Sequence, residues 1–91
     1  MMTWDELNKD FNKRRPVGEP IGSKFWFKKE WNDGRKSIND LLREFLAQFN
    51  YQYIQTYNGD IWILYQGNWT KCEWRCEANE VSFYLLEYVW N

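Results

Sequence analysis

The 91-residue sequence contains no histidine, and this absence argues against most catalytic and metal-binding interpretations. Histidine is the most frequent general base in enzymes and a common ligand of zinc. The sequence also lacks a glycine-rich phosphate loop, a nucleophile elbow and paired metal-ligand spacing. We therefore predict a protein that is not an enzyme and that has no catalytic residue, no metal site and no cofactor.

Long apolar runs are also absent, and cysteine is scarce. No stretch of about 18 apolar residues could form a membrane helix, and the N-terminus does not have the pattern of a signal peptide. Two cysteines without a disulfide framework agree with a reducing compartment. We expect a soluble, cytoplasmic protein that does not bind membranes.

The sequence has no strong excess of either charge. Its net charge of −1 gives no overall field to attract nucleic acid or an anionic membrane. The charges are unevenly distributed, however, because residues 1–50 hold ten of the twelve basic groups. An anionic partner, if there is one, is expected to contact the N-terminal half.

Aromatic residues are abundant, at 21% of the chain and including seven tryptophans. The length is that of one small domain, and such a domain buries only about 60–65% of the surface of its unfolded chain. Each buried aromatic side chain removes roughly 150–250 Å² from water. The aromatic residues can therefore build either a dense core or an adhesive surface.

Two helices are predicted. Thr3 and Glu6 fit a capping box, so a helix should run from about Trp4 to Lys13 and end before Pro16. A serine N-cap and an apolar stripe at helical spacing predict a second, amphipathic helix over residues 37–49.

The segment between these helices, residues 16–36, is a tryptophan-rich connection. Phe25, Phe27 and Trp31 alternate with other residues there, so a short edge strand could form from Lys24 to Lys29. The stretch "NDGR" that follows is typical of a turn.

After residue 50 the apolar period changes to two, which indicates β-strands. Asn58-Gly59, Gly67-Asn68 and Ala78-Asn79 are predicted as two-residue turns between four antiparallel strands within residues 51–90. These turns pair Ile54 with Ile63, Ile63 with Cys72, Cys72 with Leu85, Ile61 with Trp74, Trp74 with Phe83, and Cys76 with Val81. One face of the sheet is then nearly all apolar.

The predicted fold is α+β, in one domain of residues 1–91. A four-stranded antiparallel meander, or a five-stranded sheet with the edge strand, has one face packed by the amphipathic helix and is preceded by the N-terminal helix. The parts are an N-terminal helix in 1–15, a loop or short strand in 16–36, a helix in 37–49 and a sheet in 51–90.

Both cysteines, Cys72 and Cys76, are predicted to be core residues on the apolar face. Four residues along a strand span roughly 13 Å, which is too far for a disulfide. Zinc would need further cysteine or histidine ligands nearby.

The opposite face of the sheet is predicted to gather aromatic and basic side chains. Tyrosine, tryptophan and arginine are the residue types that anchor protein interfaces. The candidate binding residues are Tyr51, Tyr53, Tyr57, Trp62, Trp69, Arg75, Tyr84 and Tyr88, with Trp90 a further member. In the alternative interpretation, the N-terminal helix or the loop of residues 14–35 covers this face and buries it as a second core.

We expect a small intracellular protein that acts by binding another protein. Small, aromatic-rich chains without cofactors are common among phage-encoded inhibitors of host or defence proteins, and size and composition are the only support for that role. The alternative is an aromatic platform that stacks a small planar ligand, a nucleotide or single-stranded nucleic acid. A homodimer formed through a sheet edge is a further expectation.

Overall fold

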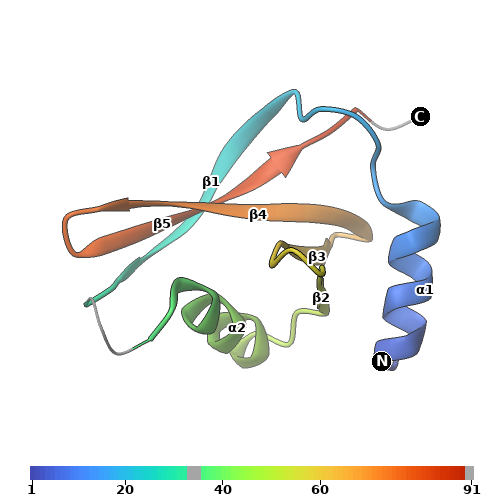
Figure 1. Ribbon diagram of the computed structural model, residues 1–91, viewed down its shortest axis with the longest axis horizontal. Coiled ribbons are helices and arrows are strands. Elements are labelled where there is room, and N and C mark those ends of the chain that lie inside the picture. The colour runs from blue at the N-terminus through green and yellow to red at the C-terminus, as the bar shows by residue number, and fades with distance from the viewer. Residues whose placement is uncertain (33–35, 90–91) are drawn as a thin grey trace.

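The protein has an α+β fold with two helices and one open, five-stranded antiparallel sheet. The computed structural model describes residues 1–32 and 36–89 of the chain, and Figure 1 shows the arrangement of the elements. The elements are α1 (Trp4–Arg14), β1 (Gly22–Glu30), α2 (Ile38–Gln48), β2 (Tyr53–Gln55), β3 (Ile61–Tyr65), β4 (Asn68–Glu77) and β5 (Glu80–Glu87). The strand order across the sheet is β1-β5-β4-β3-β2.

Both predicted helices are confirmed, together with their caps. The Thr3 side chain accepts a hydrogen bond from the backbone N–H of Glu6, and the Glu6 carboxylate accepts one from the Thr3 N–H, which completes the capping box of α1. Ser37 caps α2 by accepting a hydrogen bond from the backbone N–H of Asp40. Local sequence signals therefore fix where both helices begin.

The helices pack on opposite sides of the sheet. In Figure 1, α2 lies beneath the sheet, and α1 stands at the end of the molecule beside β2 and β3. Successive side chains of a strand point to opposite faces, so we name the two faces the α2 side and the α1 side.

The strand expected near Lys24 to Lys29 is confirmed as β1, an edge strand paired with β5. A bulge between Phe25 and Phe27 interrupts the pairing. Phe25 pairs with Tyr84 and lies on the α1 side, whereas Trp26 and Phe27 both pack against the core of the α2 side. The predicted simple alternation is therefore wrong, because the bulge adds one residue to the strand. The turn predicted at "NDGR" extends into residues 33–35, which lie outside the described residues.

The first hairpin has a three-residue loop rather than the predicted two-residue turn at Asn58-Gly59. The backbone N–H of Thr56 donates to the carbonyl of Asp60 at 2.8 Å, and Gly59, with a φ of 95°, donates to the carbonyl of Thr56 at 3.0 Å. Glycine suits this left-handed position because it has no Cβ. The extra loop residue shifts the pairing by one position.

This shift reverses every side chain of β2. Ile54 pairs with Trp62, and Tyr53 pairs with Ile63, so the predicted pairing of Ile54 with Ile63 is wrong. Ile54 lies in the core of the α1 side, and Tyr53 packs against the core of the α2 side. A one-residue slip in register exchanges the two faces of a strand.

The second hairpin turns at Gln66-Gly67, one residue before the predicted position. Moving a two-residue turn by one position changes the pairing by two residues, so each side chain keeps its predicted face. Ile61 therefore pairs with Cys72, and Ile63 pairs with Thr70, rather than with the predicted partners. The third turn, and the predicted pairs Cys72 with Leu85, Trp74 with Phe83 and Cys76 with Val81, are confirmed.

The sheet separates two hydrophobic cores. The core of the α2 side consists of Leu42, Leu46, Ile61, Ile63, Cys72, Val81, Phe83 and Leu85. The core of the α1 side consists of Leu7, Phe11, Ile54, Trp62 and Trp69. In the described residues, no helix has both the length and the apolar character that crossing a membrane requires.

The predicted core face is only partly buried near the tip of the β4–β5 hairpin. Cys72 is buried, as expected, but Cys76 is exposed and Trp74 retains 38% of its accessible surface. Figure 1 shows the hairpin tip extending beyond the end of α2, which explains the exposure of Cys76. Both thiols are free.

Candidate functional site

The structure divides the eight predicted binding residues among several places. Tyr51 and Tyr53 pack against the core of the α2 side, because the longer first loop reverses β2. Tyr57 lies in that loop and is exposed. The prediction that these three tyrosines share a face with Trp62 is therefore wrong.

Trp62 and Trp69 lie on the predicted face, but α1 covers them. The Phe11 ring lies 5.2 Å from the Trp62 ring and 5.4 Å from the Trp69 ring, measured between centroids. Trp69 is fully buried. These contacts match the alternative interpretation, in which the N-terminal helix buries part of this face as a second core.

A polar contact fixes α1 on the sheet. The indole N–H of Trp69 donates to the carboxylate of Asp10 at 2.8 Å, and Arg14 donates to the same carboxylate at 2.7 Å. Arg14 also donates to the carbonyl of Gly67, in the turn between β3 and β4, at 3.2 Å. The hydrogen bonds that the Asp10 carboxylate accepts, chiefly from Arg14 and then from Trp69, hold the pKa of Asp10 below its ordinary value.

Tyr88 belongs to the edge of this second core. Its ring stacks on Trp62 at a centroid distance of 5.9 Å and an angle of 26°. Burial raises the pKa of the Tyr88 phenol, because the charged form loses hydration. Tyr88 is half-buried, so only part of its ring can contact a partner.

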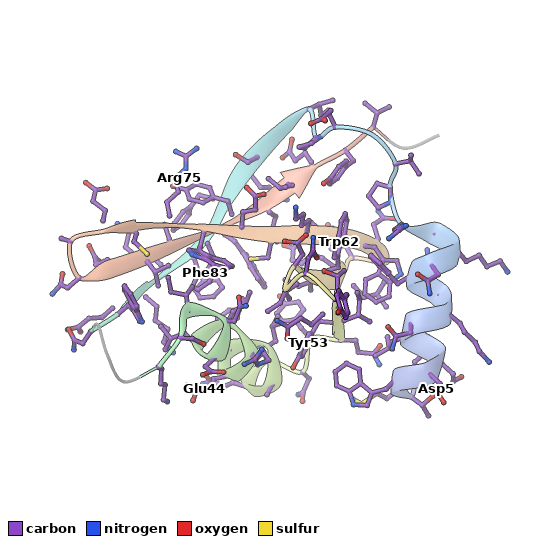
Figure 2. The ribbon with its side chains drawn as sticks, viewed as in Figure 1. Asp5, Glu44, Tyr53, Trp62, Arg75 and Phe83 are labelled. Carbon is purple, nitrogen blue, oxygen red and sulfur yellow. The ribbon has the colours of Figure 1, made fainter. Side chains whose placement is uncertain are left out.

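No described element covers the rest of the α1 side, a surface across β1, β5 and β4; Trp90, predicted as a further member, lies outside the described residues. We name this surface the open face, and its members are Phe25, Lys28, Glu73, Arg75, Ser82 and Tyr84. Figure 2 shows Arg75 pointing away from α2, whereas Phe83 of the neighbouring strand points toward α2. Arg75 and Tyr84 are the predicted binding residues that lie here.

Three side chains at the centre of the open face support one another. The Phe25 ring packs edge-on against the Tyr84 ring at 5.9 Å, and the Arg75 guanidinium lies 5.4 Å from the centroid of Tyr84. Such cation–π contacts contribute roughly 0.5–1 kcal/mol at exposed positions. Phe25 nevertheless keeps 55% of its surface exposed. The members of the trio therefore contact one another within the chain itself, and Phe25 and Arg75 remain accessible.

Sequence reasoning missed Phe25 as a member of this surface. It placed Phe25 with Phe27, because simple alternation puts the two rings on one face. The three consecutive aromatic residues "FWF" could have indicated the bulge, since a bulge lets two of the three rings enter one core.

Charged residues lie in rows on the α1 side of the sheet. Lys28 and Arg75 both pair with Ser82, so two cations flank one position of β5. Two residues nearer the hairpin tip, Glu30 and Glu77 both pair with Glu80. The surface therefore carries cations and carboxylates close together.

A separate hollow lies between the start of α1 and the loop after α2. Its volume is about 280 Å³, and its lining is mostly apolar and includes Trp4, Leu7 and Tyr53. The Trp4 ring packs edge-on against Tyr53 at 5.6 Å. None of the described residues that line this hollow has a charged side chain. Among residues 1–32 and 36–89, no group of three or more metal-ligand side chains is close enough to hold a metal ion.

Comparisons with protein-family models, with curated proteins and with solved structures find no match to this chain.

Proposed function

We propose that the protein acts by binding another protein through the open face. The observation that carries this proposal is the accessible trio of Phe25, Arg75 and Tyr84, whose members already contact one another. Tyrosine and arginine are enriched among the residues that dominate binding energy at protein interfaces. Side chains that are already ordered lose less entropy on binding.

The strands beneath the trio set the spacing of its side chains. Phe25 and Tyr84 are directly paired on neighbouring strands, and the other face of β5 is buried in the core of the α2 side. Removing an exposed side chain of the trio should therefore weaken binding with little effect on folding. Truncation of the buried Trp69, by contrast, would destabilise the fold itself.

An inhibitor of a host or defence protein would act through the same occupation of a partner's surface. Two free cysteines agree with a reducing, cytoplasmic setting for this interaction. The proposal requires no cofactor and no catalytic group.

A planar ligand or single-stranded nucleic acid is the second candidate for the open face. The stacking of Arg75 on Tyr84 favours it, because such pairs can stack on bases. Glu73 pairs with Tyr84 and would repel a phosphate close to that ring. The mixed charge of the surface therefore supports a protein partner over a polyanion.

Quantitative affinity capture with matched variants tests the proposal. Phe25→Ala and Arg75→Ala should each reduce capture of a specific partner by about tenfold or more. Phe49→Ala is the matched control, since Phe49 is 56% exposed and lies at the end of α2. Circular dichroism should show that all three variants remain folded.

Equal capture of the partner by the wild-type protein and both open-face variants would contradict the proposal. A titration of tryptophan fluorescence with nucleotides and oligonucleotides addresses the second candidate. A salt-sensitive response to oligonucleotides would favour that candidate instead.

A further inference from the structure

The sheet ends in two very different edges. β2 forms one edge with three residues, whereas β1 forms the other with nine. Pairing with β5 holds β1 at both ends and is interrupted only by the bulge at Trp26, since Ile21 N–H donates to Glu87 at 2.8 Å and Trp31 N–H donates to Asn79 at 2.7 Å. In the part of the chain that the structure describes, no strand pairs with the opposite side of β1. Its outward backbone groups are available to another strand.

The β1 edge is basic. Lys24, Lys28 and Lys29 lie in this strand, and Glu30 is its single acidic residue. No carboxylate of the described residues forms an ion pair with any of these three lysines. Lys24 places its ammonium group 5.4 Å from the Tyr65 ring, and Lys28 lies on the α1 side, so positive charge flanks the strand on both faces.

We infer that the β1 edge binds an acidic, extended protein segment that adds a sixth strand to the sheet. In this mode of recognition, backbone hydrogen bonds provide affinity, and side chains on alternate positions provide specificity. Carboxylates on one face of the added strand would lie beside Lys28 on the α1 side, or beside Lys24 and Lys29 on the α2 side. This inference does not depend on the proposed function of the open face.

A second copy of the chain fits this edge poorly. Pairing of β1 with β1 of a second copy brings together two strands that each carry three lysines and one glutamate. Like charges directly opposite each other destabilise a strand pair. An acidic segment converts the same positions into attractive pairs.

Lysines on an edge strand also protect a protein from aggregation. Protection and recognition make different predictions, however. A purely protective edge rejects every added strand, whereas a recognition edge discriminates by charge. The bulge at Trp26 divides the edge into two stretches, and each stretch contains lysine, so an acidic strand can pair with either one.

A peptide titration with charge reversal tests the inference. The probe is a fluorescein-labelled nonapeptide with blocked termini in which glutamate alternates with valine, and its counterpart has lysine in place of glutamate. Fluorescence anisotropy should show the wild-type protein binding the glutamate probe. The double variant Lys24→Glu/Lys28→Glu should bind that probe about tenfold more weakly and bind the lysine probe about tenfold more tightly than the wild type does.

Two further measurements locate the effect. The variant Lys9→Glu/Lys13→Glu on α1 makes the same change in net charge away from β1 and should bind the glutamate probe like the wild type. In hydrogen-exchange NMR, the glutamate probe should protect amides of β1 that point away from β5.

Failure of both probes to bind at millimolar concentration would overturn the inference, as would equal affinity of the double variant and the wild type for the glutamate probe. Protection confined to amides outside β1 would also overturn it. None of these results affects the capture experiment on Phe25 and Arg75, so failure of the inference and failure of the proposed function can be told apart.

Discussion

The two sides of the sheet differ in how completely a helix covers them. On the α2 side, Leu42 and Leu46 of α2 are fully buried against a continuous core, and Phe27 stacks between Phe45 and Phe83 at centroid distances of 3.7 and 4.6 Å. On the α1 side, α1 likewise contributes two buried residues, Leu7 and Phe11, and covers Trp62 and Trp69, but no described element covers the β1–β5 part of the sheet.

This difference separates a side whose side chains are mostly buried from a side that keeps an exposed aromatic surface. Exposed aromatic surface next to a stable core is typical of interaction sites. Under the proposed function, a partner on the open face would leave α2 undisturbed, because the side chains of that face point away from the larger core.

Large-to-small substitution in each core tests this division most strongly. Phe83→Ala and Trp69→Ala should each lower the free energy of unfolding by about 3–5 kcal/mol, because each removes a fully buried ring. We expect Trp69→Ala to release α1 while α2 keeps its protection, and Phe83→Ala to loosen both helices. Urea unfolding and hydrogen-exchange NMR measure the two effects. Equal loss of protection in α1 and α2 after Trp69→Ala would show that the two cores form one cooperative unit.

Substitution in the loop between β2 and β3, whose length determines which β2 side chains enter each core, should change the stability less. Gly59 has a φ of 95°, so Gly59→Ala should destabilise the fold by about 1 kcal/mol or more. Gly22→Ala is the control, since Gly22 has no positive φ and an added Cβ would meet only the Glu87 side chain, at 4.0 Å. Similar unfolding midpoints for the two variants would show that the loop does not need glycine.

The contact that holds α1 should depend on pH. The pKa of Asp10 is lowered in the folded protein, so its bonds to Arg14 and Trp69 stabilise the fold above the unfolded pKa and are lost as pH falls through the folded pKa. Asp10→Asn should therefore cost about 1 kcal/mol at neutral pH and little near pH 2. Urea unfolding from about pH 7 to about pH 2 measures this. Glu19→Gln, in the exposed loop, is the control and should leave the free energy of unfolding at neutral pH unchanged.

Thiol labelling compares the covered and uncovered ends of the α2 side, with no expected change in stability. Burial, and then Glu73, raises the pKa of Cys72 to about 12, whereas Cys76 is exposed. At any pH below its ordinary pKa, the fraction of Cys72 present as thiolate is then roughly a thousandfold smaller than it would be with the ordinary pKa. Iodoacetamide should label Cys76 first, as peptide mass spectrometry would show. Rapid labelling of Cys72 in the folded protein would contradict its burial beneath α2.

Much of the fold could be predicted because its signals are local. The capping box at Thr3, the serine cap of α2 and the turn after Glu77 each depend on residues adjacent in the chain. The edge strand and the order of the meander follow from apolar periods of two. The membership of the candidate site was harder to predict, because it depends on loop length and on a bulge.

The sequence by itself determined the two helices, the strands and the pairing of β4 with β5, since hydrogen bonds and apolar periods between near neighbours specify them. Only the tertiary structure decided which aromatic residues are buried. One additional loop residue before Asp60 moved Tyr53 to the α2 side, the bulge at Trp26 left Phe25 on the open face, and α1 covered Trp62. The physical reason is that the side-chain period of a strand is two, so a single inserted residue exchanges its faces, and long-range packing selects which exchange is stable.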